Sequence, residues 1–385
     1  MTKNSSSIKS PRLASLDALR GFDMFWIMSG EQIVHALAKA TGWRVFTILS
    51  DQLHHTIWDG FTFYDMIFPL FLFIAGAALP FSLDKKVQEA GVGYAYELPA
   101  MEKRKFIGRM LRRAIILILL GLVVNGVLRF NGLQNTRFPS VLGRIGLAWF
   151  FAGIIYLGGS LRWQIGWFFF LLVGYWAAMM LIPVPGYGAG VLTMDGSLES
   201  YIDRLLLPGR LHDKIHDPEG VLSTIPAIGT ALLGVFTGSF LKGQGAGWSM
   251  LKKGGYLAAA GLLILLAGKG WGFVFPINKR LWSSSFVLYA GGWSMLLLSV
   301  FYLVIDVAGW KKWAFPFMII GANSIVIYIA SEGMIDFGHT ADFVFGGLVH
   351  LSPAVWQPVW SAVSLTFVQL VFLYFLYRNK LFLKV

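Results

Sequence analysis

Long blocks of apolar residues alternate with short polar segments along almost the whole chain. A helix that crosses a membrane needs about 20 mainly apolar residues, and ten blocks approach that length. Their approximate limits are 15–37, 61–83, 107–128, 141–159, 163–182, 222–241, 253–270, 284–305, 315–331 and 358–377. Because most connections are short, the pattern predicts an all-α, polytopic transmembrane helix bundle of about ten spans.

The polar segments predict one integral-membrane domain over residues 1–385, since none is long enough to form a separate soluble domain. Residues 1–12 form a short polar tail. The longest loop on the opposite side, residues 183–221, opens with prolines and glycines that favour turns. Its second half, RLHDKIHDPEG, is a candidate surface helix that would end at Asp217-Pro218.

The composition supports a membrane protein and gives it an orientation. Of the 385 residues, 56% are hydrophobic and 14% are charged, whereas soluble domains are ~45–50% apolar and ~25% charged. With the N-terminus in the cytoplasm, 20 of the 32 Lys and Arg residues fall on the cytoplasmic side and 11 on the other. This bias predicts that both termini are cytoplasmic. The net charge of +12 then indicates contact with anionic lipids, and no nucleic acid is expected as a partner.

Several kinds of chemistry are excluded by the residues that are missing. The chain has no cysteine, so it has no disulfide, thiolate nucleophile or cysteine-ligated metal. It has no HExxH motif, and the adjacent His54 and His55 side chains diverge, so no metal is expected. No phosphate-binding P-loop and no GxSxG motif is present.

The stretch 51–83 carries the most informative polar residues. A polar turn runs directly into an apolar span, so that His54, His55, Asp59 and Asp65 lie at the end of a membrane helix. A histidine can accept a proton near neutral pH. All seven histidines fall on the outer side of the predicted topology. The pattern therefore predicts proton chemistry at the outer face of the membrane.

The first span contains ionisable residues that need an explanation, because each costs ~2.5–3.5 kcal/mol at membrane depth. Asp17 and Arg20 are three residues apart and can neutralise one another. That pair is either structural or functional. Glu31 and His35 are four residues apart and share a helical face near the outer rim.

Six motifs in a fixed order carry a family resemblance. They are SLDALRG, HTIWDGFTFYDMIFPLFLFIAG, RFPSVLGRIG, DPEG, INKRLWSSSF and GANSIVIYI. Together they resemble the heparan-α-glucosaminide N-acetyltransferase family and its bacterial amino-sugar acetyltransferase relatives. Each motif is modest alone, but the ordered set is specific and covers nearly the whole chain. The large luminal N-terminal domain of the animal enzymes is lacking, which fits a bacterial member.

The resemblance implies a bundle of ten or eleven spans, a homodimer, in the bacterial inner membrane. Such an enzyme moves the acetyl group of cytoplasmic acetyl-CoA to an amino sugar, glucosamine or N-acetylglucosamine, on the periplasmic side. The acceptor site is either an amine or a hydroxyl. Acetyl-CoA is a co-substrate, and the lipid bilayer is the other implied partner.

The resemblance also implies roles for two residues. The active histidine of the family lies in a His-x-x-Trp-Asx-Gly motif, which here begins at His55 and ends at Gly60. His55 acts as general base in direct transfer, or forms an acetyl-His55 intermediate. Where the family has an asparagine near the end of the first span, this chain has Glu31. A carboxylate cannot donate a hydrogen bond to an oxyanion unless it is protonated, so Glu31 is expected to orient His55 or the acceptor.

Further candidates follow from the chemistry of the two substrates. Arginine suits phosphate, so the expected contacts to the coenzyme phosphates are Arg20, Arg109, Arg112 and Arg113. The expected channel for the pantetheine arm is lined by Arg144, Asn323 and Ser324. The expected contacts to the sugar are Asp59, Asp217 and Glu219.

Two rival classes remain at this point. Ten spans with intramembrane carboxylates and prolines at 69, 226 and 316 also suit a solute transporter, although no inverted repeat is visible. A structural subunit of an envelope complex would show no turnover at all.

Overall fold

The computed structural model describes residues 13–129, 132–243 and 247–383, and these residues form an all-α bundle. Apart from two isolated bridges, no β-structure forms in those ranges. The fold class predicted from the apolar blocks is therefore confirmed. The predicted cytoplasmic tail, residues 1–12, lies outside the described ranges.

The helices follow one another with short connections. In the first half they are α1 (Ala14–Phe25), the π-helical turn Trp26–Gly30, α2 (Glu31–Thr41), α3 (Arg44–Gln52), α4 (Phe63–Ser82), α5 (Asp84–Glu89), α6 (Ala100–Val124), α7 (Val141–Gly158) and α8 (Leu161–Leu181). In the second half they are α9 (Leu198–Leu206), α10 (Thr224–Lys242), α11 (Met250–Trp271), α12 (Ser284–Phe301), the π-helical turn Tyr302–Val307, α13 (Phe315–Ala322), α14 (Ser324–Ile329), the π-helical turn Ala330–Met334, α15 (Phe337–Leu351) and α16 (Gln357–Arg378). Short 3₁₀ turns occupy Ala95–Glu97, Val127–Arg129 and Leu133–Asn135.

Seven helical segments in the described ranges are long and apolar enough to cross a membrane. An eighth would be the pair α13 and α14, which bends by 74° at Asn323. The expected spans 15–37 and 107–128 are helical as well, but each carries more than two charged residues within a membrane-length window. The number of ten spans stays a prediction.

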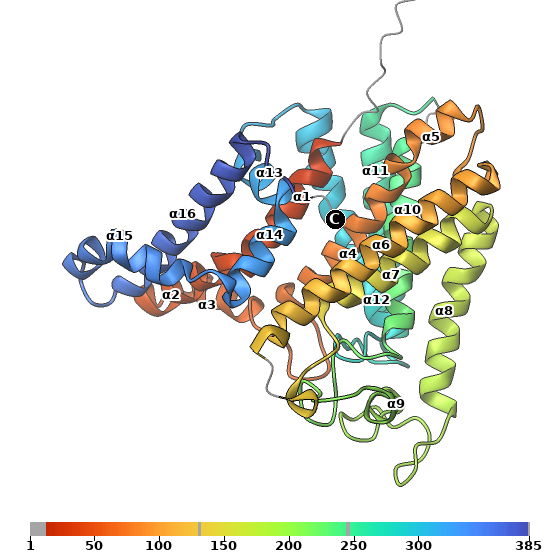
Figure 1. The fold of residues 1–385 in the computed structure, drawn as a ribbon, viewed down its shortest axis with the longest axis horizontal. Helices are drawn as coiled ribbons and strands as arrows, with labels where there is room; N and C mark the ends of the chain where they lie inside the picture. The colour runs from red at the N-terminus through yellow and green to blue at the C-terminus, as the bar shows by residue number, and fades with distance from the viewer. Residues whose placement is uncertain (1–12, 130–131, 244–246, 384–385) are drawn as a thin grey trace, which may run out of the picture.

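Helix α4 lies at the centre of the bundle and contacts α1, α7, α10 and α12 (Figure 1). It is apolar around its whole circumference, as expected for a helix enclosed by others. Glycines let α10 approach it closely: a Cβ atom on Gly234 would lie 2.0 Å from the carbonyl oxygen of Phe73. A Cβ on Gly238 would lie 2.1 Å from the carbonyl oxygen of Ala77.

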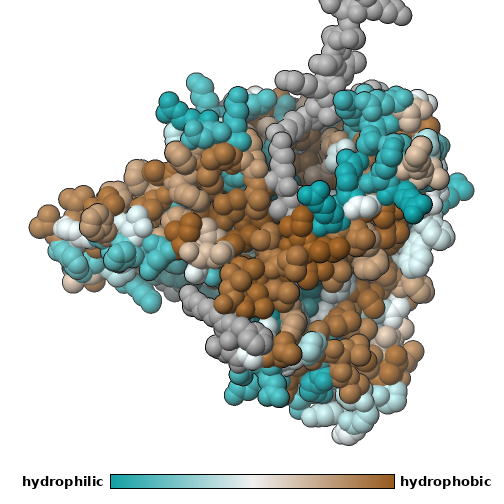
Figure 2. Space-filling model, in the orientation of Figure 1, coloured by the Kyte–Doolittle hydropathy of each residue, from teal (hydrophilic) through white to brown (hydrophobic). Residues whose placement is uncertain are grey.

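The surface matches the sequence pattern. Figure 2 shows a hydrophobic band across the middle of the molecule with hydrophilic residues at the top and bottom. In the same orientation, α5 lies at the top and α9 with its loop at the bottom (Figure 1). Helices α2, α3, α15 and α16 form an extension on the left, in which α2 contacts α3 and α16, and α15 contacts α16.

The helix expected in the second half of the outer loop is absent, and that prediction was wrong. Residues 207–217 form turns, whereas the loop's helix, α9, lies earlier at Leu198–Leu206. Ser197 caps α9 by accepting from the amide of Ser200. Leu207 follows in an extended conformation, as favoured for a residue before proline, and this ends the helix before the RLHDKIHDPEG segment begins.

Candidate functional site

The turn between α3 and α4 is built around the carboxylate of Asp65. Thr62 and Asp65 form a capping box at the start of α4, and Thr56 donates to Asp65 Oδ2 through its hydroxyl at 2.9 Å. The other carboxylate oxygen, Oδ1, lies 2.8 Å from His55 Nδ1. The Asp65 side chain is only 1% exposed. A helix cap therefore also fixes the orientation of the imidazole.

This contact distinguishes His55 from its neighbour. When Nδ1 carries the proton that is donated to Asp65, Nε2 keeps its lone pair, and that nitrogen lies 3.1 Å from Lys279 Nζ. The His55 side chain is 47% exposed, so a substrate can reach it. His54 instead has its Nδ1 2.7 Å from the carbonyl oxygen of Ser50, and its ring packs against His35. Only His55 of the two histidines is paired with a buried carboxylate.

Glu31 reaches His55 through Tyr64. The Tyr64 hydroxyl lies near the Glu31 carboxylate and interacts with it electrostatically. The ring centroid of Tyr64 lies 4.7 Å from that of His55. Tyr64 also interacts electrostatically with Glu332 and with Asp23. The predicted residue Glu31 therefore belongs to the surroundings of His55, one side chain away from the ring.

Lys279 is the cation nearest to the His55–Asp65 pair in the described chain. Its Nζ atom lies 3.1 Å from both ring nitrogens of His55 and 3.8 Å from Asp65 Oδ1. The side chain is only 17% exposed. Burial lowers the pKa of Lys279 to about 8, although the charge of Asp65 opposes that shift.

The loop that carries Lys279 is hydrogen-bonded to the turn between α3 and α4, which contains His55 and is called the histidine turn below. Asn278 Nδ2 donates to Asp59 Oδ1 at 3.0 Å, and the amide of Gly60 donates to the carbonyl oxygen of Ile277 at 2.9 Å. Gly60 has a φ of +123°, a conformation that favours glycine. The Asp59 carboxylate thus accepts a hydrogen bond from Asn278 in this structure, and the residue is exposed beside His55 and its turn.

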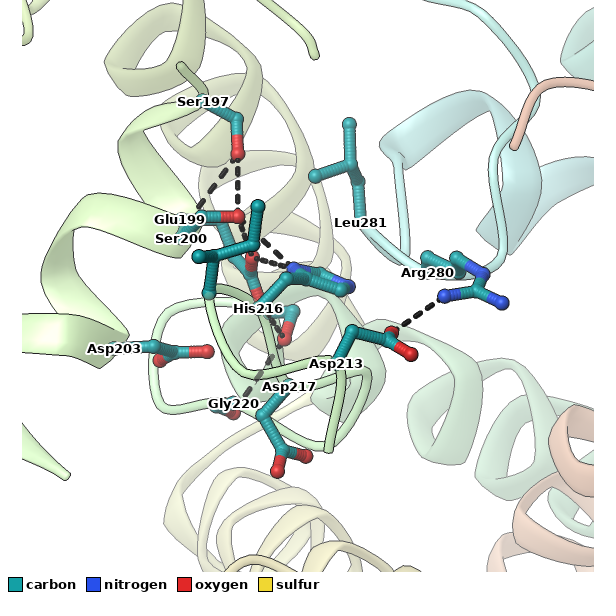
Figure 3. Close-up of polar contacts among 12 residues, drawn as sticks. Ser197, Glu199, Ser200, Asp203, Asp213, His216, Asp217, Gly220, Arg280 and Leu281 are labelled. Atoms are coloured by element: carbon teal, nitrogen blue, oxygen red, sulfur yellow. Dashed lines mark hydrogen bonds and ion pairs between the residues drawn. The ribbon is translucent and has the colours of Figure 1, made fainter. Parts of the chain in front are cut away.

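Behind the turn lies a buried polar cluster made of Glu199, Ser200, Asp203 and His216 (Figure 3). His216 Nδ1 lies 2.9 Å from Glu199 Oε2 and 3.0 Å from Ser200 Oγ. Trp58 of the histidine turn packs edge to face against the His216 ring at 5.5 Å, and its Nε1 donates to the carbonyl oxygen of Leu192. The cluster therefore supports the position of the histidine turn.

Burial controls ionisation in this cluster. It raises the pKa of Glu199 to about 7 and, with repulsion from Glu199, that of Asp203 to about 8. Burial lowers the pKa of His216 to about 4. Both shifts follow from the cost of placing a charge in a site without water. Near neutral pH Asp203 and His216 are therefore mostly uncharged, whereas Glu199 is close to half ionised.

Two predicted sugar contacts lie in an ion-paired network instead of an open pocket. Arg137 binds Asp217 through Nε at 2.8 Å and Nη2 at 2.6 Å, and it also pairs with Glu219. The amides of His212 and Glu219 donate to Asp217 as well, and the Asp217 side chain is fully buried. In Figure 3 its carboxylate points away from His216. The oxygens of Asp217 are thus occupied by the protein.

A second region lies further along α4, away from the histidine turn. A cavity of about 580 Å³ opens where α13 and α14 bend, lined among others by Arg20, Arg113, Trp149, Asn323 and Ser324. A neighbouring pocket of about 370 Å³ shares Arg20 and Arg113, and adds two more arginines. These are Arg109 and Arg112.

These two spaces fit a ligand that carries phosphate and amide groups. Four arginines supply cationic donors. Arg113 Nε and Asn323 Oδ1 are buried without a hydrogen-bond partner in the described chain, so each leaves a polar atom for a ligand. Trp149 lies under the Arg113 guanidinium at 4.5 Å. The structure thus brings together all of the predicted coenzyme residues except Arg144.

Arg144 lies in another part of the molecule. It is fully buried, donates to Ser223 Oγ at 2.5 Å and to the carbonyl oxygen of Gly220, and its guanidinium faces the Trp282 ring. Ser223 in turn donates to Glu199. Arg144 therefore joins the polar cluster behind the histidine turn and does not line either of the two spaces.

Two residues near His55 were assigned no role from the sequence. Lys279 stands out there only as a polar residue of the segment FPINKRLWSSSF, and Tyr64 is one aromatic residue in an aromatic-rich span. Both lie in motifs that carry the family resemblance, INKRLWSSSF and HTIWDGFTFYDMIFPLFLFIAG. The approach of Lys279 to His55 joins residues 224 positions apart, which local patterns do not reveal.

The arrangement defines a polytopic helical membrane protein with a histidine–carboxylate pair at one end of its central helix and an arginine-lined cavity further along it. A family model described as a domain of unknown function (DUF5009) matches residues 12–99. Heparan-alpha-glucosaminide N-acetyltransferase of Homo sapiens is 27% identical over 429 residues, covering 97% of this chain and 60% of the human protein. The protein of the same name from Mus musculus is 28% identical over 390 residues, covering 86% of this chain and 56% of its own length.

The resemblance that the six motifs indicate is thereby confirmed across most of the chain. The chain spans about 60% of the length of these relatives. Both relatives are named as N-acetyltransferases.

Proposed function

We propose that the protein is a transmembrane acetyltransferase that moves the acetyl group of acetyl-CoA to an amino sugar. The observation that carries the proposal is the 2.8 Å contact between His55 Nδ1 and the buried Asp65. It makes Nε2 of a partly exposed imidazole the nitrogen that takes the proton of the acceptor, once the Lys279 ammonium 3.1 Å away has turned to the substrate. The names of the two mammalian relatives support the transferred group and the class of acceptor.

The transfer step uses His55 as the general base. The acceptor amine or hydroxyl attacks the acetyl carbon, and a new N–C or O–C bond forms. His55 Nε2 takes the proton that the acceptor loses. The C–S bond breaks, and its electron pair leaves with the sulfur of coenzyme A. Asp65 holds the ring and stabilises the imidazolium that forms.

The arginine-lined cavity and its neighbouring pocket are the proposed site of the coenzyme, with Arg20, Arg109, Arg112 and Arg113 as the groups that hold its phosphates. Asn323 and Ser324 line the same cavity. Tyr64, next to His55, and Phe71 of the cavity wall are seven residues apart on α4, about 10 Å along its axis. A long, flexible pantetheine arm is suited to bridge that separation.

The acceptor is proposed to approach His55 from the side of the outer loop. Asp59 is exposed beside the turn and is the best placed of the predicted sugar contacts. Glu31 acts through Tyr64 as a positioning residue. We further propose glucosamine or N-acetylglucosamine as the acceptor, a bacterial inner membrane with the acceptor on the periplasmic side, and a homodimer.

The test incubates purified protein in detergent with acetyl-labelled acetyl-CoA and a panel of amino sugars, with mass spectrometry of the products. We expect an acetylated sugar, and a loss of about 10²–10⁴-fold in kcat for His55→Ala. His54→Ala is the matched control, because His54 touches no buried carboxylate. An unchanged rate for His55→Ala contradicts the role of His55. Sugar uptake into vesicles without acetylation favours a transporter instead.

The same assay separates the two mechanisms. When both substrates are varied, direct transfer gives intersecting initial-rate lines. An acetyl-His55 intermediate gives parallel lines and a labelled protein in the absence of acceptor.

A further inference from the structure

Acetyl transfer places negative charge on the acetyl carbonyl oxygen, so a hydrogen-bond donor has to lie near the reacting carbon. The donors around His55 are mostly committed to other acceptors. Both Thr56 and Thr62 donate to Asp65. The Tyr64 hydroxyl faces Glu31, which is itself a carboxylate and attracts that donor. The remaining strong donor is the Lys279 ammonium, which in this structure contacts the His55 ring itself and can turn from it to a substrate oxygen.

We propose that Lys279 is a second catalytic residue, whose ammonium group donates a hydrogen bond to the acetyl carbonyl oxygen while that oxygen becomes an oxyanion. The inference rests on the proposed function and adds a residue to it. Nζ lies 3.1 Å from both nitrogens of the His55 ring. An acceptor amine that gives its proton to Nε2 attacks a carbon about 3 Å away, which brings the carbonyl oxygen within reach of Nζ.

The fold holds Lys279 in place for this task. Asn278 Oδ1 accepts from the amide of Leu281, and the Ser283 hydroxyl accepts from the amide of Asn278. The carbonyl oxygen of Lys279 itself accepts from the amide of Trp282, a buried residue. Since the loop is also bonded to the histidine turn, the ammonium is positioned before substrate arrives, which is what makes an oxyanion donor effective.

The lysine must keep its proton to act as a donor. Burial lowers the pKa of Lys279 to about 8, while Asp65 and Glu219 favour the charged form and Arg280 opposes it. His55 is the remaining titratable group in contact with Nζ. The ammonium is therefore present at neutral pH and is lost as pH rises through about 8. Activity should fall over that range.

The test compares Lys279→Met and Lys279→Arg with the wild type in acetyl transfer, measuring kcat, KM for acetyl-CoA and the pH profile. For Lys279→Met we expect kcat to fall about 10²–10³-fold with little change in KM, and the decline above pH 8 to disappear. Lys279→Arg should keep part of kcat and move the decline to higher pH, because arginine stays protonated. Lys269→Met is the control, since Lys269 is exposed at the end of α11.

The outcomes separate the two proposals. If the wild type acetylates no acceptor, the proposed function fails and the role of Lys279 falls with it. If the wild type is active and Lys279→Met has an unchanged kcat, only the role of Lys279 is overturned. Thermal unfolding in detergent checks that the methionine variant folds. If it does not, an unchanged alkaline decline in Lys279→Arg overturns the proposal by itself.

Discussion

Asp65 both caps α4 and contacts His55, and a single substitution can separate these two effects. Its Oδ2 accepts from Thr56 and Thr62 and caps α4, while its Oδ1 faces the ring of His55. Asparagine keeps the size of the side chain and one acceptor oxygen, but it has no charge. It therefore preserves most of the cap and removes the stabilisation of the imidazolium.

We predict that Asp65→Asn lowers kcat of acetyl transfer by about 10²–10⁴-fold with a small decrease in melting temperature. The reason is that the asparagine amide can turn toward Nδ1 and force the ring proton onto Nε2, where the base should be. Steady-state kinetics and thermal unfolding in detergent measure the two effects. A variant that loses stability and keeps its kcat would assign Asp65 to the fold alone.

Residues that the sequence singled out lie together in space where a short segment contains them. His55 and Asp65 are ten residues apart, and the turn that joins them brings them together. Arg109, Arg112 and Arg113 lie on consecutive turns of α6 and reach one pocket. Asp217 and Glu219 lie in an ion-paired network, and their partner, Arg137, comes from a segment 80 residues away. Charge alone did not reveal that pairing.

At the scale of helices, the close crossing of α4 and α10 depends on glycines, which have no side chain. Gly76, Gly234 and Gly238 bring the two backbones into contact, and a Cβ at any of them would lie 2.0–2.1 Å from a carbonyl oxygen of the other helix. A methyl group there has no space unless the helices separate. Small residues at such crossings are the usual basis of helix association in membranes.

We predict that Gly234→Ala destabilises the protein by about 1–3 kcal/mol, because the added methyl group forces α10 away from Phe73. The measurement is unfolding in a denaturing detergent titration. Gly166→Ala on α8 is the matched control, since a Cβ there meets no atom within 4 Å. Its stability should be unchanged or slightly higher. Equal effects at the two positions would show that the close crossing contributes nothing.

The buried cluster under the histidine turn makes the outer loop sensitive to alkaline pH. The pKa values of Glu199 and Asp203 are raised by burial to about 7 and about 8, so both carboxyl groups bind protons more tightly in the folded loop than in an open one. The stability that they contribute is present below their unfolded values near 4 and is lost as pH rises through 7 to 8. The lowered pKa of His216 has the opposite effect: it makes the folded loop less stable as pH falls below 6.5, because the open loop then binds this proton more tightly.

We predict that the outer loop opens more readily as pH rises from 6.5 to 8.5, by up to about tenfold per pH unit for each titrating carboxyl group. Hydrogen exchange of residues 197–223, corrected for the intrinsic exchange rate, measures it. Glu199→Gln should flatten the dependence, because an amide cannot ionise. Asp195→Asn is the control, since Asp195 is exposed and its pKa is lowered by hydrogen bonds. A dependence that Glu199→Gln leaves unchanged would place its origin elsewhere.

The length of the apolar blocks was the best predictor of the helices, and it located the long apolar spans. It missed α3, α9 and α15, which are short or carry polar residues on one side. The surface helix expected in RLHDKIHDPEG is replaced by turns, with Lys214 at positive φ. The bend between α13 and α14 lies within one continuous apolar block, so hydropathy could not reveal the break that opens the cavity.

At the scale of the whole molecule, α4 separates the two halves of the proposed reaction. Its first turn holds Asp65 and the histidine turn, and its last turn, at Leu79 and Ser82, borders the pocket of Arg109 and Arg112. The 20 residues of α4 span about 30 Å, the thickness of the apolar core of a bilayer. The base and the outermost arginines therefore lie near opposite surfaces.

This separation predicts that the two substrates act from opposite sides of the membrane. In sealed proteoliposomes with the arginine side outward, acetyl-CoA added outside should be consumed only when the amino sugar is trapped inside. With the opposite orientation, external acetyl-CoA should give no product. The reason is that acetyl-CoA is too polar to cross the bilayer, so only the thioester end that enters through the protein can reach His55.

The control for orientation is the same preparation opened with detergent, in which both populations should become equally active. Arg112→Ala, in the outermost arginine pocket, should raise KM for acetyl-CoA and leave KM for the sugar unchanged. Transfer between acetyl-CoA and sugar supplied together on one side of sealed vesicles, at the rate seen in detergent, would contradict a reaction that crosses the membrane. It would instead require both substrates to reach His55 from a single mouth.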